Sequence, residues 1–261
     1  MGRNKIYRPF PPTLHVFDAP ALFDGDEEVA GIYIGVTTGG LGQGTETPPI
    51  RSAPDAVTVF MSRDGGTTYH QFVVCDTHVS SGSRLSDFSE FTPPAGEVDE
   101  EAIHNSGHEL ATGLDKISNL SISWYNQYVP ISVTDAELNN NQNRLLMGNT
   151  LSCEVLQFKT VAAVNAAAGD YAHSSLVRGR HGTENDIGKH DNDVASSIVV
   201  IDDGLYFVKL KASDIGRTLH FKALVNGMVL GDVETDYQSY KSLTYTGRNV
   251  APFAPVHVTG T

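Results

Sequence analysis

Residues 56–79 read AVTVFMSRDGGTTYHQFVVCDTHV, and this stretch decides the fold class. Apolar and polar side chains alternate with a period near two on both sides of the pair Asp64-Gly65, which is the alternation of half-buried strands. An Asp-Gly pair favours the positive φ angles that a tight turn between antiparallel strands needs. We therefore predict one β-hairpin over residues 56–79.

The same alternation recurs along the chain. It predicts a mainly β protein, either a sandwich or barrel-like with short helices, and α+β is the second choice. Asp202-Asp203-Gly204 predicts a second hairpin, between residues 198–201 and 205–210. The other strand-like runs are residues 31–37, 120–125, 153–160, 206–211 and 219–226.

Helical signals are few and short. Thr134 and Glu137 have the spacing of a capping box, which predicts one or two helical turns. Alanine-rich residues 162–168 fit a hairpin loop as well as a helix. Cys75 and Cys153 lie in apolar strand-like runs, where we expect buried free thiols rather than a disulfide.

Length and charge exclude several classes of protein. A chain of 261 residues is long enough for one large domain or two smaller ones. Its formal net charge of −13 repels phosphate backbones and anionic membranes, so we expect no nucleic acid partner. It has no apolar run of the roughly 20 residues that a transmembrane helix needs, and its basic start leads into no apolar stretch typical of a secretory signal. We expect a soluble protein without membrane insertion.

Two stretches resemble loops or linkers. Residues 38–54 are rich in Gly, Thr and Pro, and residues 93–115 carry a run of acidic side chains. A boundary near residue 115 would give a β-rich portion at 1–115 with long loops and a second at 116–250, and then an extended, proline-stiffened connector at 251–261. One continuous domain with a long central excursion fits the pattern equally well.

The candidate metal and phosphate motifs are incomplete. His104 and His108 have ligand spacing, but Asn105 stands where the catalytic zinc pattern has Glu. The glycine-rich residues 39–44 match no phosphate-binding motif, and the acidic residues 24–28 and 186–193 lack the twelve-residue calcium loop. We predict no catalytic residue, no metal and no cofactor, and therefore no enzyme.

One aromatic segment differs from the others. Trp124, Tyr125 and Tyr128 place aromatic rings on both faces of one strand-like stretch, so some of them are expected to face outward or to meet a partner. We name these three residues and Phe253 as candidate partner contacts.

Two further stretches resemble a known family. Residues 148–158 read GNTLSCEVLQF and residues 175–184 read SLVRGRHGTE. The pair resembles the signature of tail-tip proteins of tailed bacteriophages, the hub or host-specificity class, which is also similar to the large tail protein of gene transfer agents. Weaker similarity to the same family continues in the remaining blocks, which are LHVFDAPAL at 14–22, FMSRDGG at 60–66, FKA at 221–223 and NVAPFAPVHV at 249–258.

This resemblance implies a structural role in a virion. A hub of this class sits at the tail tip or baseplate, links the tail tube to host-recognition parts, and forms a homo-oligomeric ring, a trimer by resemblance. Its partners would be the distal tail protein and other hub or fibre subunits, after synthesis in the host cytoplasm. The alternative is a receptor-binding module for host-surface carbohydrate or protein, in which Trp124 and residues 38–54 would make the contacts. A hydrolase of the cell envelope is disfavoured, because the sequence offers no catalytic constellation.

The motif itself has a physical interpretation independent of the resemblance. Its glycines allow positive φ angles, its threonine can cap the next turn, and its charged side chains can exchange hydrogen bonds with one another. We therefore predict a structural turn that leaves the sheet, with direct partner contact as the alternative. The residues concerned are Arg178, Gly179, Arg180, Gly182, Thr183 and Glu184.

Overall fold

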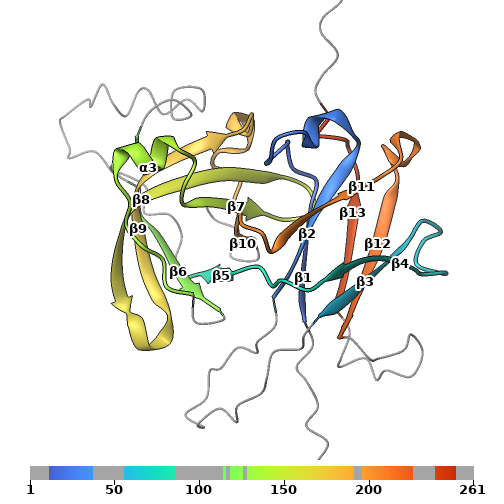
Figure 1. Ribbon diagram of the computed structural model, residues 1–261, viewed down its shortest axis with the longest axis horizontal. Coiled ribbons are helices and arrows are strands. Elements are labelled where there is room, and N and C mark those ends of the chain that lie inside the picture. The colour runs from blue at the N-terminus through green and yellow to red at the C-terminus, as the bar shows by residue number, and fades with distance from the viewer. Residues whose placement is uncertain are drawn as a thin grey trace, which may run out of the picture.

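The computed structural model describes residues 12–37, 56–85, 114–115, 118–125, 128–190, 196–225 and 239–250. Its strands form a closed barrel and two smaller sheets, which confirms the mainly β prediction (Figure 1). The barrel has the order β10-β5-β6-β9-β8-β7, and the sheets have the orders β1-β2-β11 and β13-β12-β3-β4.

The strands divide among the barrel and the two sheets. The barrel contains β5 (Ser81–Arg84), β6 (Leu120–Trp124), β7 (Arg144–Gly148), β8 (Cys153–Asn165), β9 (Asp170–Arg180) and β10 (Ser197–Val200). The three-stranded sheet contains β1 (Thr13–Phe17), β2 (Gly31–Thr37) and β11 (Leu205–Lys209), and the four-stranded sheet contains β3 (Val57–Ser62), β4 (His70–Cys75), β12 (Thr218–Val225) and β13 (Ser239–Thr244). The short helices are η1 (Asp26–Glu28), α3 (Asp135–Asn139), η2 (Ala166–Ala168), η3 (Glu184–Asp186) and η4 (Ala212–Asp214).

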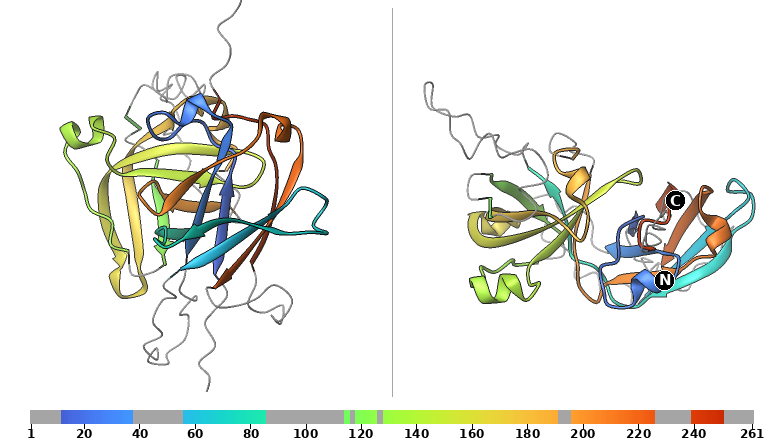
Figure 2. Two further views of the ribbon diagram at one scale, coloured as in Figure 1. Left: turned by 45° about the vertical axis from the view of Figure 1, so that its right-hand side comes forward. Right: turned by 90° about the horizontal axis from the view of Figure 1, so that it is seen from above.

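The two smaller sheets pack on each other beside the barrel (Figure 2). The core between them takes the inward side chains of β1, β2, β3 and β12, such as Ile34 and Phe221. A second apolar cluster, which includes Tyr33 and Val155, joins the three-stranded sheet to the barrel. A third fills the barrel interior around Phe158. Three apolar clusters therefore stabilise the sheet pair, its junction with the barrel and the barrel interior.

The first predicted hairpin is confirmed as β3 and β4, which pair antiparallel with a register shift between Val59 and Phe60. Gly65 and Gly66 hold positive φ angles of 73° and 85° in its turn. The Asp64 carboxylate accepts hydrogen bonds from the backbone of the next two threonines, which fixes the loop. These contacts are local, so the turn chemistry of the sequence was sufficient to find them.

The second predicted hairpin is wrong. β10 lies between β5 and β7 in the barrel, whereas β11 pairs with β2 in another sheet. The Asp202-Asp203-Gly204 turn passes the chain from the barrel to that sheet instead of folding it back. Gly204 is needed because a Cβ there would lie 2.7 Å from the backbone nitrogen of Val79.

Hydrogen-bonded sheets span the proposed boundary at residue 115. β2 pairs with β11, β3 pairs with β12, and β5 pairs with β6. A division at 115 would therefore cut all three sheets. The proposed connector at residues 251–261 lies outside the described residues.

The short helices and the two cysteines depend on nearby residues. The capping box forms at α3, where the Thr134 N–H donates to Glu137 Oε2 at 2.8 Å and the Glu137 N–H donates to Thr134 Oγ1 at 3.3 Å. Residues 162–165 complete β8, and residues 166–168 form the short turn η2 that leads into β9, so the stretch is the end of a β-hairpin. Cys75 and Cys153 are buried free thiols. Within the described residues, no helix is long and apolar enough to cross a membrane.

Candidate functional site

The motif at residues 178–184 ends β9 and begins with a buried ion pair. Arg178 Nε donates to Glu154 Oε1 at 2.8 Å, and its Nη2 donates to Oε2 at 2.6 Å. Glu154 is fully buried and Arg178 is 3% exposed. The predicted exchange between Arg178 and Glu184 is therefore wrong, because the neighbouring strand β8 places Glu154 under the guanidinium. Glu154 lies in the quoted stretch GNTLSCEVLQF, but its pairing depends on strand register that the sequence does not reveal.

The turn after the ion pair needs a left-handed backbone, as predicted. Gly179, His181 and Gly182 have φ angles of 62°, 55° and 78°. Thr183 precedes η3 but does not cap it through its side chain, which corrects that prediction. Its Oγ1 instead donates to the Arg180 carbonyl at 2.7 Å and accepts from the Val155 N–H at 3.0 Å. The threonine therefore ties the turn back onto β8.

The other charged members of the motif lie nearer the surface. Arg180 Nη2 donates to Asn141 Oδ1 at 3.4 Å. Glu184 occupies the first position of η3 and is half-buried. The pairing of Arg178 with Glu154 is the only buried salt bridge that these positions make in the described part of the chain.

The last residue of η3 joins the motif region to the segment that follows β13. Asp186 accepts from Lys189 Nζ at 2.7 Å and also pairs with Arg248. Burial opposes the charge of Arg248, yet its hydrogen bond to Asp186 raises its pKa. The backbone of Arg248 donates to Asp18, whose carboxylate also accepts from Thr246 Oγ1 at 2.6 Å. We call Asp18, Asp186, Thr246 and Arg248 the carboxylate junction.

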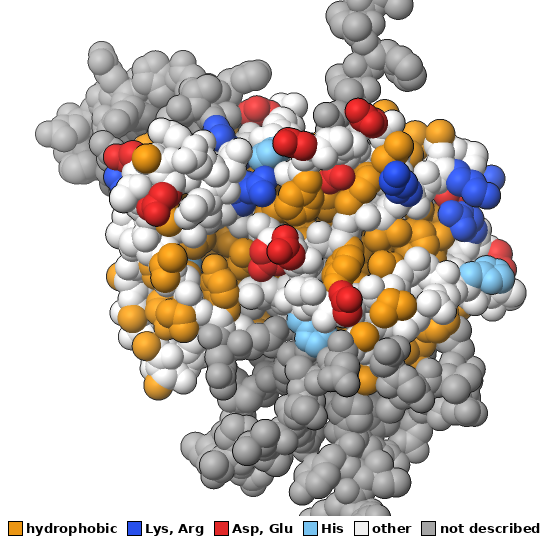
Figure 3. All heavy atoms as spheres, viewed as in Figure 1, with side chains coloured by type: hydrophobic (Ala, Val, Ile, Leu, Met, Phe, Trp, Pro, Cys, Tyr) orange, Lys and Arg blue, Asp and Glu red, His pale blue; other side chains and the backbone are white. Residues whose placement is uncertain are grey.

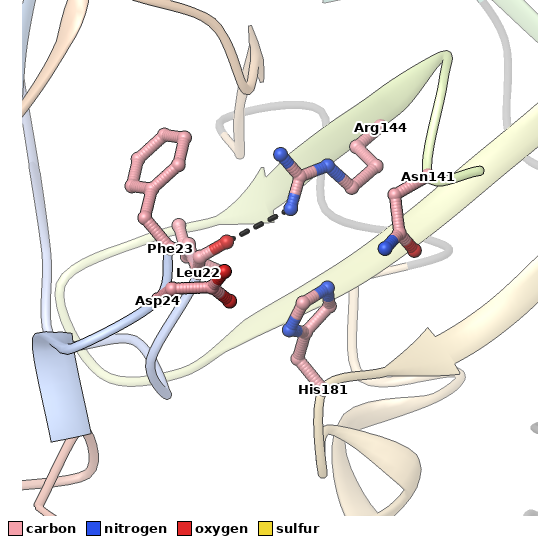
Figure 4. Close-up of a pocket in the computed structure, with 6 residues that line it drawn as sticks. All are labelled: Leu22, Phe23, Asp24, Asn141, Arg144 and His181. Carbon is pink, nitrogen blue, oxygen red and sulfur yellow. Dashed lines mark hydrogen bonds between the residues drawn. The ribbon is translucent and has the colours of Figure 1, made fainter.

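A pocket of about 260 Å³ lies beside the turn (Figure 4). Arg144 Nη1 donates to the Leu22 carbonyl at 2.8 Å, and the guanidinium lies 5.5 Å from the Phe23 ring centroid. His181 Nδ1 donates to the Ala21 carbonyl at 3.1 Å. Burial, and to a smaller extent the positive charge of Arg144, lowers the pKa of His181, so its imidazole is neutral at pH 7. The pocket is lined by Leu22, Phe23, Asp24, Asn141, Arg144 and His181.

These contacts determine what the pocket can do. Arg144 and His181 both bind carbonyls of the segment before η1, so they hold residues 21–24 against the barrel. The pocket combines the opposite charges of Asp24 and Arg144 with the apolar side chains of Leu22 and Phe23. The pocket and the carboxylate junction thus both bind residues of the segment at 18–24, between β1 and η1.

The aromatic candidates separate into buried and partly exposed positions. Trp124 is 4% exposed and lies inside the barrel, because alternate residues of β6 face its interior. Its Nε1 donates to His173 Nε2 at 3.3 Å, and its ring meets Tyr128 edge-on at 4.8 Å. Tyr125 and Tyr128 are half-buried, and Phe253 lies outside the described residues. Trp124 is therefore a core residue, which corrects its interpretation as a partner contact.

The candidate metal and phosphate motifs found in the sequence do not bring a set of binding side chains together within the described ranges. His104, His108 and the glycine-rich residues 39–44 lie outside these ranges. In the acidic stretch at 24–28, Asp26 accepts from the Tyr33 hydroxyl at 2.6 Å. In the stretch at 186–193, Asp186 belongs to the carboxylate junction. Among the described residues, no three His, Cys, Asp or Glu side chains cluster as a metal site would require.

Comparison with known proteins adds one partial match. A family model described as Rcc01698-like, C-terminal, matches residues 98–199. The matched part contains β6, β7, β8 and β9, and it includes both Glu154 and Arg178. No curated protein shows significant similarity to the chain.

Proposed function

We propose that this protein is a structural component of the tail tip or baseplate hub of a phage or phage-like particle. In this role it links the tail tube to host-recognition parts, and it is not an enzyme. The observation that carries the proposal is the structural role of residues 178–184, which belong to the signature that resembles the tail-tip family. Its arginine, glycines and threonine hold β8, β9 and the turn after them together, and the adjoining Asp186 ties this turn to the sheet pair. A hub that transmits force between neighbouring tail proteins needs contacts of this kind to hold its own parts together.

The surface supports assembly into a larger body. Exposed apolar side chains occur on both the barrel and the sheet pair, and orange side chains appear over both parts in Figure 3. Those on the barrel are the ones that we propose for subunit contacts. We propose a homo-oligomer, a trimer by resemblance, in contact with the distal tail protein and with other hub or fibre subunits in the virion. The side chains concerned are Val129, Ile131, Leu151 and Val164, of which Leu151 is 85% exposed.

Receptor binding through Trp124 is not supported by its position. The indole is inside the barrel, and residues 38–54, the other part of that alternative, lie outside the described ranges. A receptor-binding role would therefore need a different surface.

The test is the location and copy number of the chain in purified particles. We expect mass spectrometry of isolated tails to detect it, and native mass spectrometry of the tail tip to give several copies, three by resemblance. A reconstruction should place the copies around the tail axis. Absence from purified particles, or a single copy on the axis, would overturn the proposal.

A further inference from the structure

The outer face of the four-stranded sheet carries a row of aromatic and basic side chains. In the strand register, Lys222 of β12 lies between Tyr240 of β13 and Phe60 of β3. Neighbouring residues of these strands, such as Phe221 and Met61, point the other way into the core. The row therefore faces outward, and Tyr240 is 49% exposed.

Two tyrosine rings flank the lysine. The Lys222 ammonium lies 4.0 Å from the ring centroid of Tyr69 and 5.0 Å from that of Tyr240. Its cation–π contacts hold the charge in a fixed place above the sheet. Among the described residues, no carboxylate forms an ion pair with Lys222. Phe60, Tyr69, Lys222 and Tyr240 form what we call the tyrosine–lysine face.

The segment from β11 to β12 has a net positive charge, whereas the whole chain has a net negative charge. The net charge is −13, but residues 205–225 contain four basic side chains and one acidic side chain. The acidic one, Asp214, is bound by Arg63 through two parallel contacts at 3.0 and 2.9 Å. Lys and Arg side chains gather at the upper right of Figure 3, over the region of β11 and β12. This region attracts an anion and is a poor fit for another basic surface. The basic residues are Lys211, Arg217 and Lys222, together with Lys209 on β11, which belongs to the other sheet and lies outside the tyrosine–lysine face.

We propose that the tyrosine–lysine face binds the carboxylate-bearing sugars of an acidic polysaccharide. The C–H side of a pyranose ring packs on a tyrosine ring, and the sugar carboxylate forms a charge-assisted hydrogen bond with Lys222. Peptides are instead recognised at strand edges or in grooves, whereas these residues lie on the open face of a sheet. The binding face is separate from the carboxylate junction, so its failure would leave the hub proposal untouched.

Calorimetric titration of the purified protein with oligogalacturonate tests the inference. We expect binding that weakens as salt rises, and none to a neutral oligosaccharide of equal length. Lys222→Gln should raise the Kd about tenfold, as expected for the loss of one charged hydrogen bond. Lys222→Arg and Tyr240→Phe should retain most of the affinity, and Tyr240→Ser should lose several-fold. Lys209→Gln is the matched control, because it removes a positive charge from β11 outside the face, and it should leave Kd within about twofold.

The alternatives give different results. Equal binding of polyglutamate and oligogalacturonate would show attraction by charge alone and would overturn the proposal. So would the absence of binding to oligogalacturonate, or an unchanged Kd in both Lys222→Gln and Tyr240→Ser. Thermal melts check that each variant folds. If Lys222→Gln is unstable, the Kd of Tyr240→Ser still tests the proposal, because Tyr240 is half-exposed.

Discussion

At the scale of single residues, His173 shows how a buried side chain makes the barrel sensitive to pH. Its Nδ1 donates to the Leu120 carbonyl at 3.0 Å, and its Nε2 accepts from Trp124, because an indole N–H can only donate. Burial lowers the pKa of His173 to about 4. If His173 Nε2 were protonated, its N–H would face the indole N–H of Trp124, and neither group could accept a hydrogen bond. The folded barrel therefore requires the neutral ring.

The pH dependence of stability is set by this depressed pKa. Between about pH 4 and 6.5 the unfolded chain binds more protons at this residue, so stability falls as pH falls through that range. From pH 6.5 to pH 5 we expect a loss of about 1.5 kcal/mol in the free energy of unfolding from His173 alone. Denaturant titrations at both pH values measure it. His173→Gln should lose this part of the dependence and keep the part from His15, whose pKa burial lowers to about 3. The same pH dependence in parent and variant would contradict the assignment.

A second residue-scale prediction concerns the buried ion pair. Arg178→Met leaves the Glu154 carboxylate buried without its guanidinium partner, so we expect a loss of about 3–5 kcal/mol in the free energy of unfolding. Replacing both residues, with Glu154→Leu beside Arg178→Met, should recover much of that loss because no buried charge remains. Denaturant titration of the two variants gives the comparison. A double variant no more stable than Arg178→Met would show that the cost lies in packing instead.

At the scale of elements, the turn between β9 and η3 distinguishes two glycines. A Cβ at Gly182 would meet no atom within 4 Å, so substitution there is opposed only by its φ of 78°. A Cβ at Gly179 would also lie 2.7 Å from Ile187 Cδ1 and 2.9 Å from Glu184 Cα. We expect Gly182→Val to cost about 1–3 kcal/mol, Gly182→Asn less, and Gly179→Ala more than Gly182→Ala. Thermal melts rank the variants, and a Gly182→Val melt equal to that of the parent would show that the turn tolerates a side chain.

The elements that sequence reasoning found were those fixed by nearby residues. The β3–β4 turn and the α3 capping box depend on side chains within a few positions, so their chemistry is visible in the sequence. Asp202-Asp203-Gly204 has the same local chemistry as a hairpin turn, but the pairing of β11 with distant β2 decides the path. The partner of Arg178 was missed for the same reason, since Glu154 reaches it only through the β8–β9 register.

At the scale of the whole molecule, the last described residues connect the sheet pair to the barrel. Asn249 is 1% exposed, and its Oδ1 accepts from the Gly31 N–H at 3.2 Å. Its Nδ2 donates to the carbonyls of Asp26 and Val29 at 2.8 and 2.6 Å. The preceding Arg248 reaches Asp186 beside the barrel. The chain therefore closes on itself through side chains at 248 and 249, immediately before the predicted connector at 251–261.

This closure predicts a sharp difference between two changes near the C-terminus. Asn249→Ala removes the acceptor of the buried Tyr245 hydroxyl and the donor to the carbonyls of Asp26 and Val29, each of which is costly to leave unsatisfied, while the Gly31 N–H keeps its hydrogen bond to the Tyr245 oxygen. We expect it to cost at least about 2 kcal/mol, which for a chain of this size lowers the melting temperature by roughly 4–8 °C. Deleting residues 251–261 keeps every one of these contacts, so the melt of the truncated protein should match that of the parent while its incorporation into tails weakens. Thermal melts and tail incorporation are measured on the same two variants. Unfolding of the truncated protein would show that the deleted residues belong to the core, and that the fold does not close at Asn249.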